Sequence, residues 1–156
     1  MTADECLAAL RKSWYPDREW AFLPQVANAT GGRYGRTADA IALNCWPSRG
    51  MELHGFEVKC YRGDWKRELE APEKAEAIAQ YCDRWFLVVP DEKIVKPEEL
   101  PPTWGLFVVG EDGKPAQVKP AGKLEPKPFS RGFVAAVLRA AQKEEGIPRS
   151  EHQRLM

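Results

Sequence analysis

The sequence predicts a single α/β domain with a mixed β-sheet. A segment with helical periodicity opens the chain, and three strand-like segments follow it with only turns between them. A second helical region then leads to a continuous apolar segment. Consecutive strands joined by turns pair antiparallel, whereas a strand–helix–strand unit makes a right-handed parallel crossover. Both kinds of pairing are therefore expected in one sheet.

The first half of the chain is expected to hold one helix and three strands. Residues 3–14 carry apolar side chains at helical spacing. Residues 20–27 are rich in strand formers, but Pro24 lacks a ladder donor, so this strand is expected at a sheet edge or with a bulge. Residues 36–44 and 53–61 are the next two strands, and we expect them to pair antiparallel.

The second half is expected to alternate between helices and strands. Residues 64–83 have a helical pattern that is interrupted at Ala71-Pro72, where a second helix can start. Residues 85–89 are continuously apolar, which is typical of a strand buried on both faces. The remaining expected elements are a hairpin of residues 104–109 and 116–119 around Asp112-Gly113, and a last helix that Ser130 caps.

Composition limits the classes of protein that need to be considered. The chain has 156 residues and formal net charge +0, which suits one domain and argues against coating nucleic acid by bulk charge. No stretch is apolar enough for a membrane span, and no secretory signal is visible. The four cysteines lack zinc-site spacing and indicate a reducing cytoplasm. We expect one domain over residues 1–145 and a mobile tail over residues 146–156.

Two carboxylates and a lysine can meet on the second and third strands. Asp39 precedes an apolar run, and in the next strand Glu57 and Lys59 alternate with apolar neighbours. If these strands are neighbours, the three side chains converge. Mg²⁺ prefers oxygen ligands and needs only one or two carboxylates, and a lysine can stabilise charge that develops on a phosphoryl group. The pattern therefore suits metal-dependent phosphodiester cleavage.

Asp39, the segment Glu57-Val58-Lys59 and the order of elements resemble the PD-(D/E)xK, or restriction-endonuclease-like, nuclease superfamily. In that superfamily an acidic residue on the second core strand is followed by acidic-x-lysine on the third. The wider pattern is similar to a group of small phage and bacterial members. The stretches that carry this likeness are Trp46–Gly50, Gly55–Lys59, Asp64-Trp65 and Tyr81–Asp83.

The resemblance implies a restriction-endonuclease-like core, arranged as helix, three-strand meander, helix and strand, with an added C-terminal hairpin and helix. It implies an Mg²⁺- or Mn²⁺-dependent deoxyribonuclease acting in DNA repair, recombination or phage genome processing, and it allows a homodimer. Asp39 and Glu57 would be the metal ligands, with the Val58 carbonyl as a third. Lys59 would complete the catalytic set.

Further residues follow from the same resemblance. Gln25 stands where members of the superfamily often have another acidic residue, and its amide oxygen can bind a metal or its water without charge. Lys74, on the second helix, is either a supporting site residue or a surface lysine paired with Glu70. The candidates for contact with DNA phosphates are Arg33, Arg36, Arg49, Arg62 and Lys66.

Two other interpretations remain open at this level. The chain can be a catalytically weak or inactive DNA-binding module with the same fold, for which uncharged Gln25 is the hint. Alternatively, it can be a structural or adaptor protein in which Glu57 and Lys59 only line the wet face of a sheet. Whether Asp39 and Glu57 converge in one concave place separates this last interpretation from the others.

Overall fold

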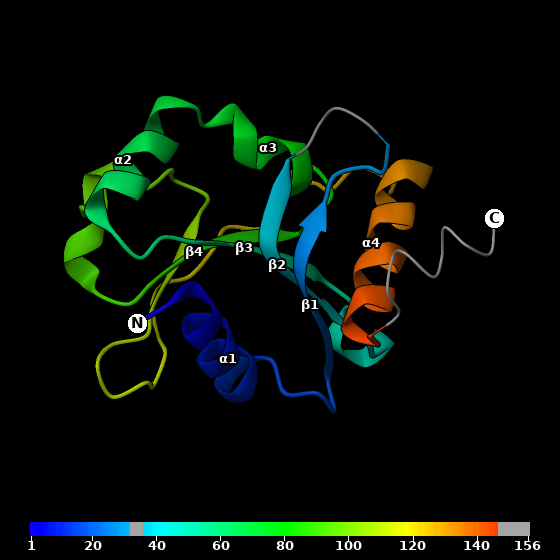
Figure 1. The fold of residues 1–156 in the computed structure, drawn as a ribbon, viewed down its shortest axis with the longest axis horizontal. Coiled ribbons are helices and arrows are strands. Elements are labelled where there is room, and N and C mark those ends of the chain that lie inside the picture. The colour runs from blue at the N-terminus through cyan, green and yellow to red at the C-terminus, as the bar shows by residue number, and fades with distance from the viewer. Residues whose placement is uncertain (32–35, 147–156) are drawn as a thin grey trace.

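The computed structural model describes residues 1–31 and 36–146 (Figure 1). Within these ranges it contains one six-stranded sheet and four α-helices. The helices are α1 (Ala3–Trp14), α2 (Arg62–Glu70), α3 (Glu73–Ala79) and α4 (Arg131–Glu144). The strands are β1 (Trp20–Ala27), β2 (Thr37–Asn44), β3 (Leu53–Val58), β4 (Arg84–Val89), β5 (Gly105–Val108) and β6 (Ala116–Lys119). Arg33 and most of the expected tail lie outside the described residues.

The sheet is mixed, as the element order predicted. Its strands lie in the order β1-β2-β3-β4-β5-β6. The first three form an antiparallel meander, β3, β4 and β5 are parallel, and β6 returns antiparallel to β5. The expected pairing of the second and third strands is confirmed, and so is the edge position of the strand that contains Pro24. Pro24 is tolerated there because an edge strand needs fewer ladder donors.

Helices cover both faces of the sheet. On one face, Cys6, Leu7 and Leu10 of α1 pack in a cluster with sheet residues such as Phe56. The opposite face packs against the other three helices, which contribute Trp65 from α2, Ile78 from α3 and Phe133 from α4. Figure 1 shows α1 apart from the other three helices. The catalytic candidates lie on the face covered by α2 and α3.

Local sequence signals account for where the helices start. Thr2 and Glu5 form a reciprocal capping box at α1, with both side-chain-to-backbone distances at 3.1 Å. Ser130 caps α4 by accepting from the backbone N–H of Phe133. The chain also breaks between α2 and α3 at Ala71-Pro72, as expected. None of the helices in the described part of the chain is long and apolar enough to cross a membrane.

The main difference from the sequence-based expectation lies at the end of the third strand. The strand expected over residues 53–61 ends at Val58, and α2 begins at Arg62 rather than at Asp64. Lys59 keeps one bond to the sheet, because its backbone N–H donates to the Val88 carbonyl at 3.0 Å. The alternation of apolar and polar side chains continues past Val58, so the sequence pattern predicted too long a strand.

Candidate active site

The site lies where β2 and β3 separate. Paired residues run from Leu43 with Leu53 to Ala40 with Phe56, and the ladder stops there. At the next position, the Asp39 carboxylate accepts a hydrogen bond from the Val58 backbone N–H at 2.7 Å. The carboxylate thus replaces the strand carbonyl that would otherwise accept this bond. Asp39 is therefore held at the point of divergence, with its other oxygen not used in this contact.

Gln25 lies across from Asp39 on the neighbouring strand. The register of β1 and β2 pairs Pro24 with Ala40 and Val26 with Ala38, so position 25 stands opposite position 39. Gln25 is exposed and has φ of 54°, a left-handed conformation that is uncommon for residues other than glycine. The sheet therefore places Gln25 beside the acidic position.

Glu57 and Lys59 follow at the end of β3, and a third residue joins them from α2. Lys59 Nζ lies 3.2 Å from Glu57 Oε1 and 3.4 Å from Glu68 Oε2. The side chains of Lys59, Glu57 and Glu68 are only 18, 14 and 9% exposed. A lysine held between two nearly buried carboxylates has little conformational freedom. Its ammonium is therefore positioned by the fold.

The charges in this cluster perturb one another. Burial raises the pKa of Glu57, the negative charges of Asp39 and Glu68 raise it further, and Lys59 opposes the shift. Burial alone would lower the pKa of Lys59, but the nearby Glu57 and Glu68 outweigh it and raise that pKa. Lys59 is thus held as a cation, whereas the Glu57 carboxylate lacks full charge compensation from the protein.

Asp39 and Glu57 are the residues that could hold Mg²⁺ or Mn²⁺. Within residues 1–31 and 36–146, no group of three or more His, Cys, Asp or Glu side chains is placed to hold a metal ion. Asp39 and Glu57 nevertheless offer two carboxylates at adjacent positions of neighbouring strands, close enough for the charge of Asp39 to act on Glu57. Mg²⁺ keeps several waters and is usually bound through one or two carboxylates. A cation there would also relieve the repulsion between the two acids.

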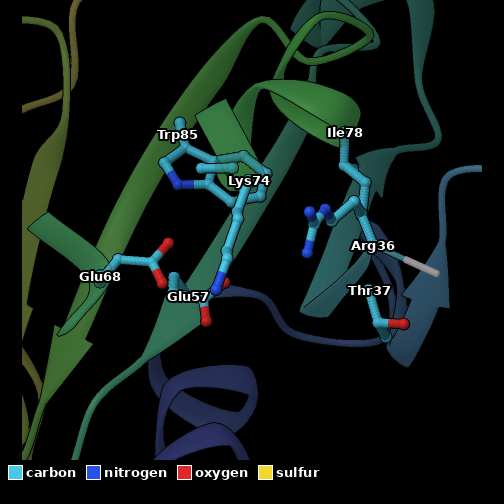
Figure 2. A pocket seen from close by; sticks show the side chains of 8 residues that line it. Arg36, Thr37, Glu57, Glu68, Lys74, Ile78 and Trp85 are labelled. Carbon is cyan, nitrogen blue, oxygen red and sulfur yellow. The ribbon is translucent and has the colours of Figure 1, made fainter. Parts of the chain in front are cut away.

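A cavity of about 260 Å³ opens beside this cluster (Figure 2). It lies between the sheet and the helices α2 and α3. Figure 2 shows Lys74 reaching from α3 toward Glu57, with Arg36 and Glu68 on either side of it. The residues that line the cavity are Arg36, Thr37, Glu57, Glu68, Lys74, Ala75, Ile78 and Trp85.

The four candidates for DNA contact that the structure describes do not form one patch. Arg36 lines the cavity, whereas Arg49 pairs with Glu19 at 3.2 Å and follows β2 at the end opposite to Asp39. Arg62 binds Glu99 through both of its terminal nitrogens, so it mainly fixes α2 to the segment after β4. Lys66 is exposed on α2. Arg33 lies outside the described residues.

Sequence reasoning missed Glu68 and Trp85 and ranked Lys74 low. Lys74 lines the cavity, and no ion pair between it and Glu70 occurs in the described part of the chain. The helical spacing between Glu68 and buried Trp65 was a usable signal, because residues three apart on a helix share a face. Trp85 looked like an ordinary core residue, and nothing in the sequence indicates that it borders a cavity.

Comparisons with known proteins extend the description of the fold. No family model and no curated protein matches the chain. A solved structure, titled SPO1766 protein of unknown function from Silicibacter pomeroyi, is similar to it with a TM-score of 0.56 and 22% sequence identity. The similarity covers 93% of this chain and 92% of the other. The two proteins thus share a mixed α/β fold over nearly their full lengths.

Proposed function

We propose that this protein is a metal-dependent deoxyribonuclease with a restriction-endonuclease-like core. The observation that carries the proposal is the convergence of Asp39, Glu57 and Lys59 where β2 and β3 diverge. The order α1, β1, β2, β3, helices, β4 supports the core assignment, with β5, β6 and α4 as additions. The adaptor interpretation loses its main support, because Glu57 and Lys59 are largely buried in a cluster and do not line a wet face.

Each residue has a distinct role in this proposal. Asp39 and Glu57, with the Val58 carbonyl, would hold Mg²⁺ or Mn²⁺, which supplies Lewis acidity and orients the attacking water. Lys59, fixed by Glu57 and Glu68, places a positive charge beside the phosphate, where negative charge grows in the transition state. Arg36 and Lys74 bring further positive charge to the cavity rim.

The proposal is tested by incubating duplex, single-stranded and branched DNA with the protein in Mg²⁺, in Mn²⁺ and in chelator. We expect cleavage of at least one DNA form, dependent on the metal and reduced about 100-fold or more in Lys59→Ala. Lys143→Ala, an exposed lysine on α4, is the matched control and should cut like the parent. Absence of cleavage of every DNA form with both metals would refute the nuclease assignment.

One observation favours a second candidate function, a DNA-binding module of the same fold that cuts weakly or not at all. Gln25, opposite Asp39, brings no charge to a position where a third carboxylate would strengthen metal binding. Gln25→Glu tests this alternative. If metal affinity limits the reaction, this substitution should increase the melting-temperature rise caused by Mg²⁺ and should increase any cleavage. A module without a nuclease site would show neither effect.

A further inference from the structure

The cavity beside Glu57 contains a buried hydrogen-bond donor that has no acceptor in the described part of the chain. Trp85 is 1% exposed, and its indole Nε1 makes no hydrogen bond with any residue that the structure describes. In Figure 2 this nitrogen lies on the side of the ring that faces Glu57 and Glu68. A buried donor without an acceptor lowers the stability of the fold by about 1–3 kcal/mol, so such groups normally bond to protein, water or ligand atoms. Because Trp85 lines the cavity, an occupant of the cavity can supply the acceptor.

Two cations line the same cavity without an ion-pair partner among the residues that the structure describes. Arg36 and Lys74 are exposed and form no ion pair within residues 1–31 and 36–146. The two carboxylates on the other wall, Glu57 and Glu68, share Lys59. The cavity therefore offers an occupant two cations that have no ion-pair partner among the described residues and one neutral N–H, opposite a wall with two carboxylates. These three donors favour a ligand rich in acceptor oxygens and negative charge, and Lys59 offsets part of the charge of Glu57 and Glu68.

We propose that this cavity binds the terminal phosphate of a DNA strand, a phosphomonoester, through Arg36, Lys74 and the Trp85 N–H. A phosphomonoester carries close to two negative charges and three strong acceptor oxygens, which match two cations and one further donor. This proposal rests on the proposed function, because the bound strand end would place the next phosphodiester beside Glu57. It specifies the substrate as DNA with a phosphorylated end.

The shape of the cavity favours a strand end over the middle of a strand. Its volume of about 260 Å³ is several times the ~30 Å³ that one water molecule takes in the liquid. The lining also includes Ala75, Ile78 and Trp85, three buried side chains that close it toward the core. The DNA strand continues in both directions from an internal phosphodiester and therefore needs two exits from a site. A terminal phosphate needs only one exit, so it can lie against such a closed wall.

The experiment measures binding, so that it does not depend on cleavage. Oligonucleotides with phosphorothioate linkages, which resist hydrolysis, carry a 5′-phosphate, a 3′-phosphate or two hydroxyl ends. Their affinities are measured in Mg²⁺ and in chelator, with inorganic phosphate as a competitor. We expect one phosphorylated form to bind at least about tenfold more tightly than the hydroxyl form, since a charge-assisted hydrogen bond contributes that much. The preferred form identifies which strand end the pocket accepts.

Variants assign the preference to the cavity. Arg36→Gln with Lys74→Gln should abolish it, while Arg139→Gln with Lys143→Gln, exposed positions on α4 with the same charge change, should leave it intact. Trp85→Phe should reduce it, whereas Trp104→Phe, which removes a neighbouring indole 6.1 Å away, should not. If Trp85→Phe does not fold, the double variant Arg36→Gln with Lys74→Gln still tests whether the cavity causes the preference.

The outcomes separate this proposal from the nuclease assignment. Equal affinity for all three oligonucleotides in both buffers overturns the terminal-phosphate site, even if the protein cuts DNA. Competition by inorganic phosphate without a preference for phosphorylated strands overturns it too, because the pocket would then take the free ion alone. A preference that Arg36→Gln and Lys74→Gln abolish supports the site, even if no cleavage is found.

Discussion

Glu57 is the residue whose chemistry depends most on the fold. On an isolated strand it would be an ordinary carboxylate, but here it is largely buried and near Asp39 and Glu68. Burial and like charges both disfavour its ionised form, and only Lys59 opposes them. The ionised Glu57 therefore lowers the stability of the metal-free protein, and unfolding measurements can detect this.

Glu57→Gln should raise the melting temperature in chelator by about 2–5 °C at about pH 8, and by much less at about pH 5. A carboxyl whose pKa is higher in the folded than in the unfolded protein binds its proton more tightly when folded. It therefore lowers the free energy of unfolding as pH rises above its ordinary pKa of about 4.3. Glutamine mimics the neutral form, so the difference between variant and parent grows with pH.

Melting curves of the parent, Glu57→Gln and the control Glu70→Gln, an exposed acid on α2, provide the measurement. The lowered pKa of His54 acts equally in all three proteins and cancels in the differences. Added Mg²⁺ should stabilise the parent and the control but not Glu57→Gln, because a ligand that binds only the folded state shifts the unfolding equilibrium. An equal Mg²⁺ effect in all three would show that Glu57 is not a ligand.

At the scale of elements, the parallel contact between β3 and β4 sets the floor of the site. Gly55 lies opposite Trp85 in this pair, and the large indole packs over the space that a side chain would occupy. A Cβ at position 55 would lie 2.3 Å from the Trp85 ring and 3.0 Å from Cys82 Sγ. The glycine is therefore required by packing, because Trp85 and Cys82 are both buried.

Gly55→Ala should lower the free energy of unfolding by about 2–3 kcal/mol, because overpacking a rigid core forces side chains or backbone to shift. The matched control is Gly63→Ala in α2, where the nearest atom to the added Cβ is the end of Arg67 at 3.9 Å. That change should be neutral or stabilising by up to about 1 kcal/mol, since alanine is the better helix former. Urea unfolding of both variants decides, and a neutral Gly55→Ala would show that Trp85 is free to move.

At the scale of the whole molecule, a few ion pairs join segments that are far apart in sequence. Glu52, just before β3, accepts from Arg84 Nε at 2.8 Å and lies 3.0 Å from His54 Nε2. Arg84 also donates to the Ala121 carbonyl at 2.8 Å, which attaches the C-terminal loop to β4. These contacts lie at the end of β3 opposite to the candidate site. They contribute to stability and not to the proposed chemistry.

Acid should unfold the protein in part through this network, with the Arg62–Glu99 pair as a second contributor. The hydrogen bond from Arg84 lowers the pKa of Glu52 to about 2, against the effect of burial. A carboxyl with a lowered pKa in the folded state stabilises the fold above its ordinary pKa, and this contribution disappears as pH falls from about 4.5 to about 2. Burial also lowers the pKa of His54, which removes further stability below its ordinary pKa of about 6.5.

Melting temperatures from about pH 7 to about pH 2 test this expectation. The parent should lose stability steeply below about pH 4.5, whereas Glu52→Gln should be less stable at pH 7, on the order of 2 kcal/mol, and less sensitive to acid. Glu125→Gln, at an exposed position of the C-terminal loop, is the control and should follow the parent. Identical acid profiles for Glu52→Gln and the parent would assign acid unfolding to other groups.

Much of the fold was predictable because local patterns decide it. Helical spacing over residues 3–14, the cap at Ser130 and the apolar run after Arg84 each indicated an element that the structure contains. Short turns and one helical connection then determined which strands are antiparallel and which are parallel. Asp39, Glu57 and Lys59 could be placed together for the same reason, since adjacent strands bring fixed positions side by side.

Contacts between segments far apart in sequence could not be read from these patterns. Glu68 reaches Lys59 only because α2 folds back over the sheet. The charge of Arg62 is paired with that of Glu99, which lies 37 residues later in the chain. The cavity with Arg36, Lys74 and Trp85 is assembled from the residue before β2, from α3 and from β4. Residue type and periodicity report what a side chain can do and which face it occupies. Only tertiary packing sets the distance to its partner, and burial and charge interactions depend on that distance.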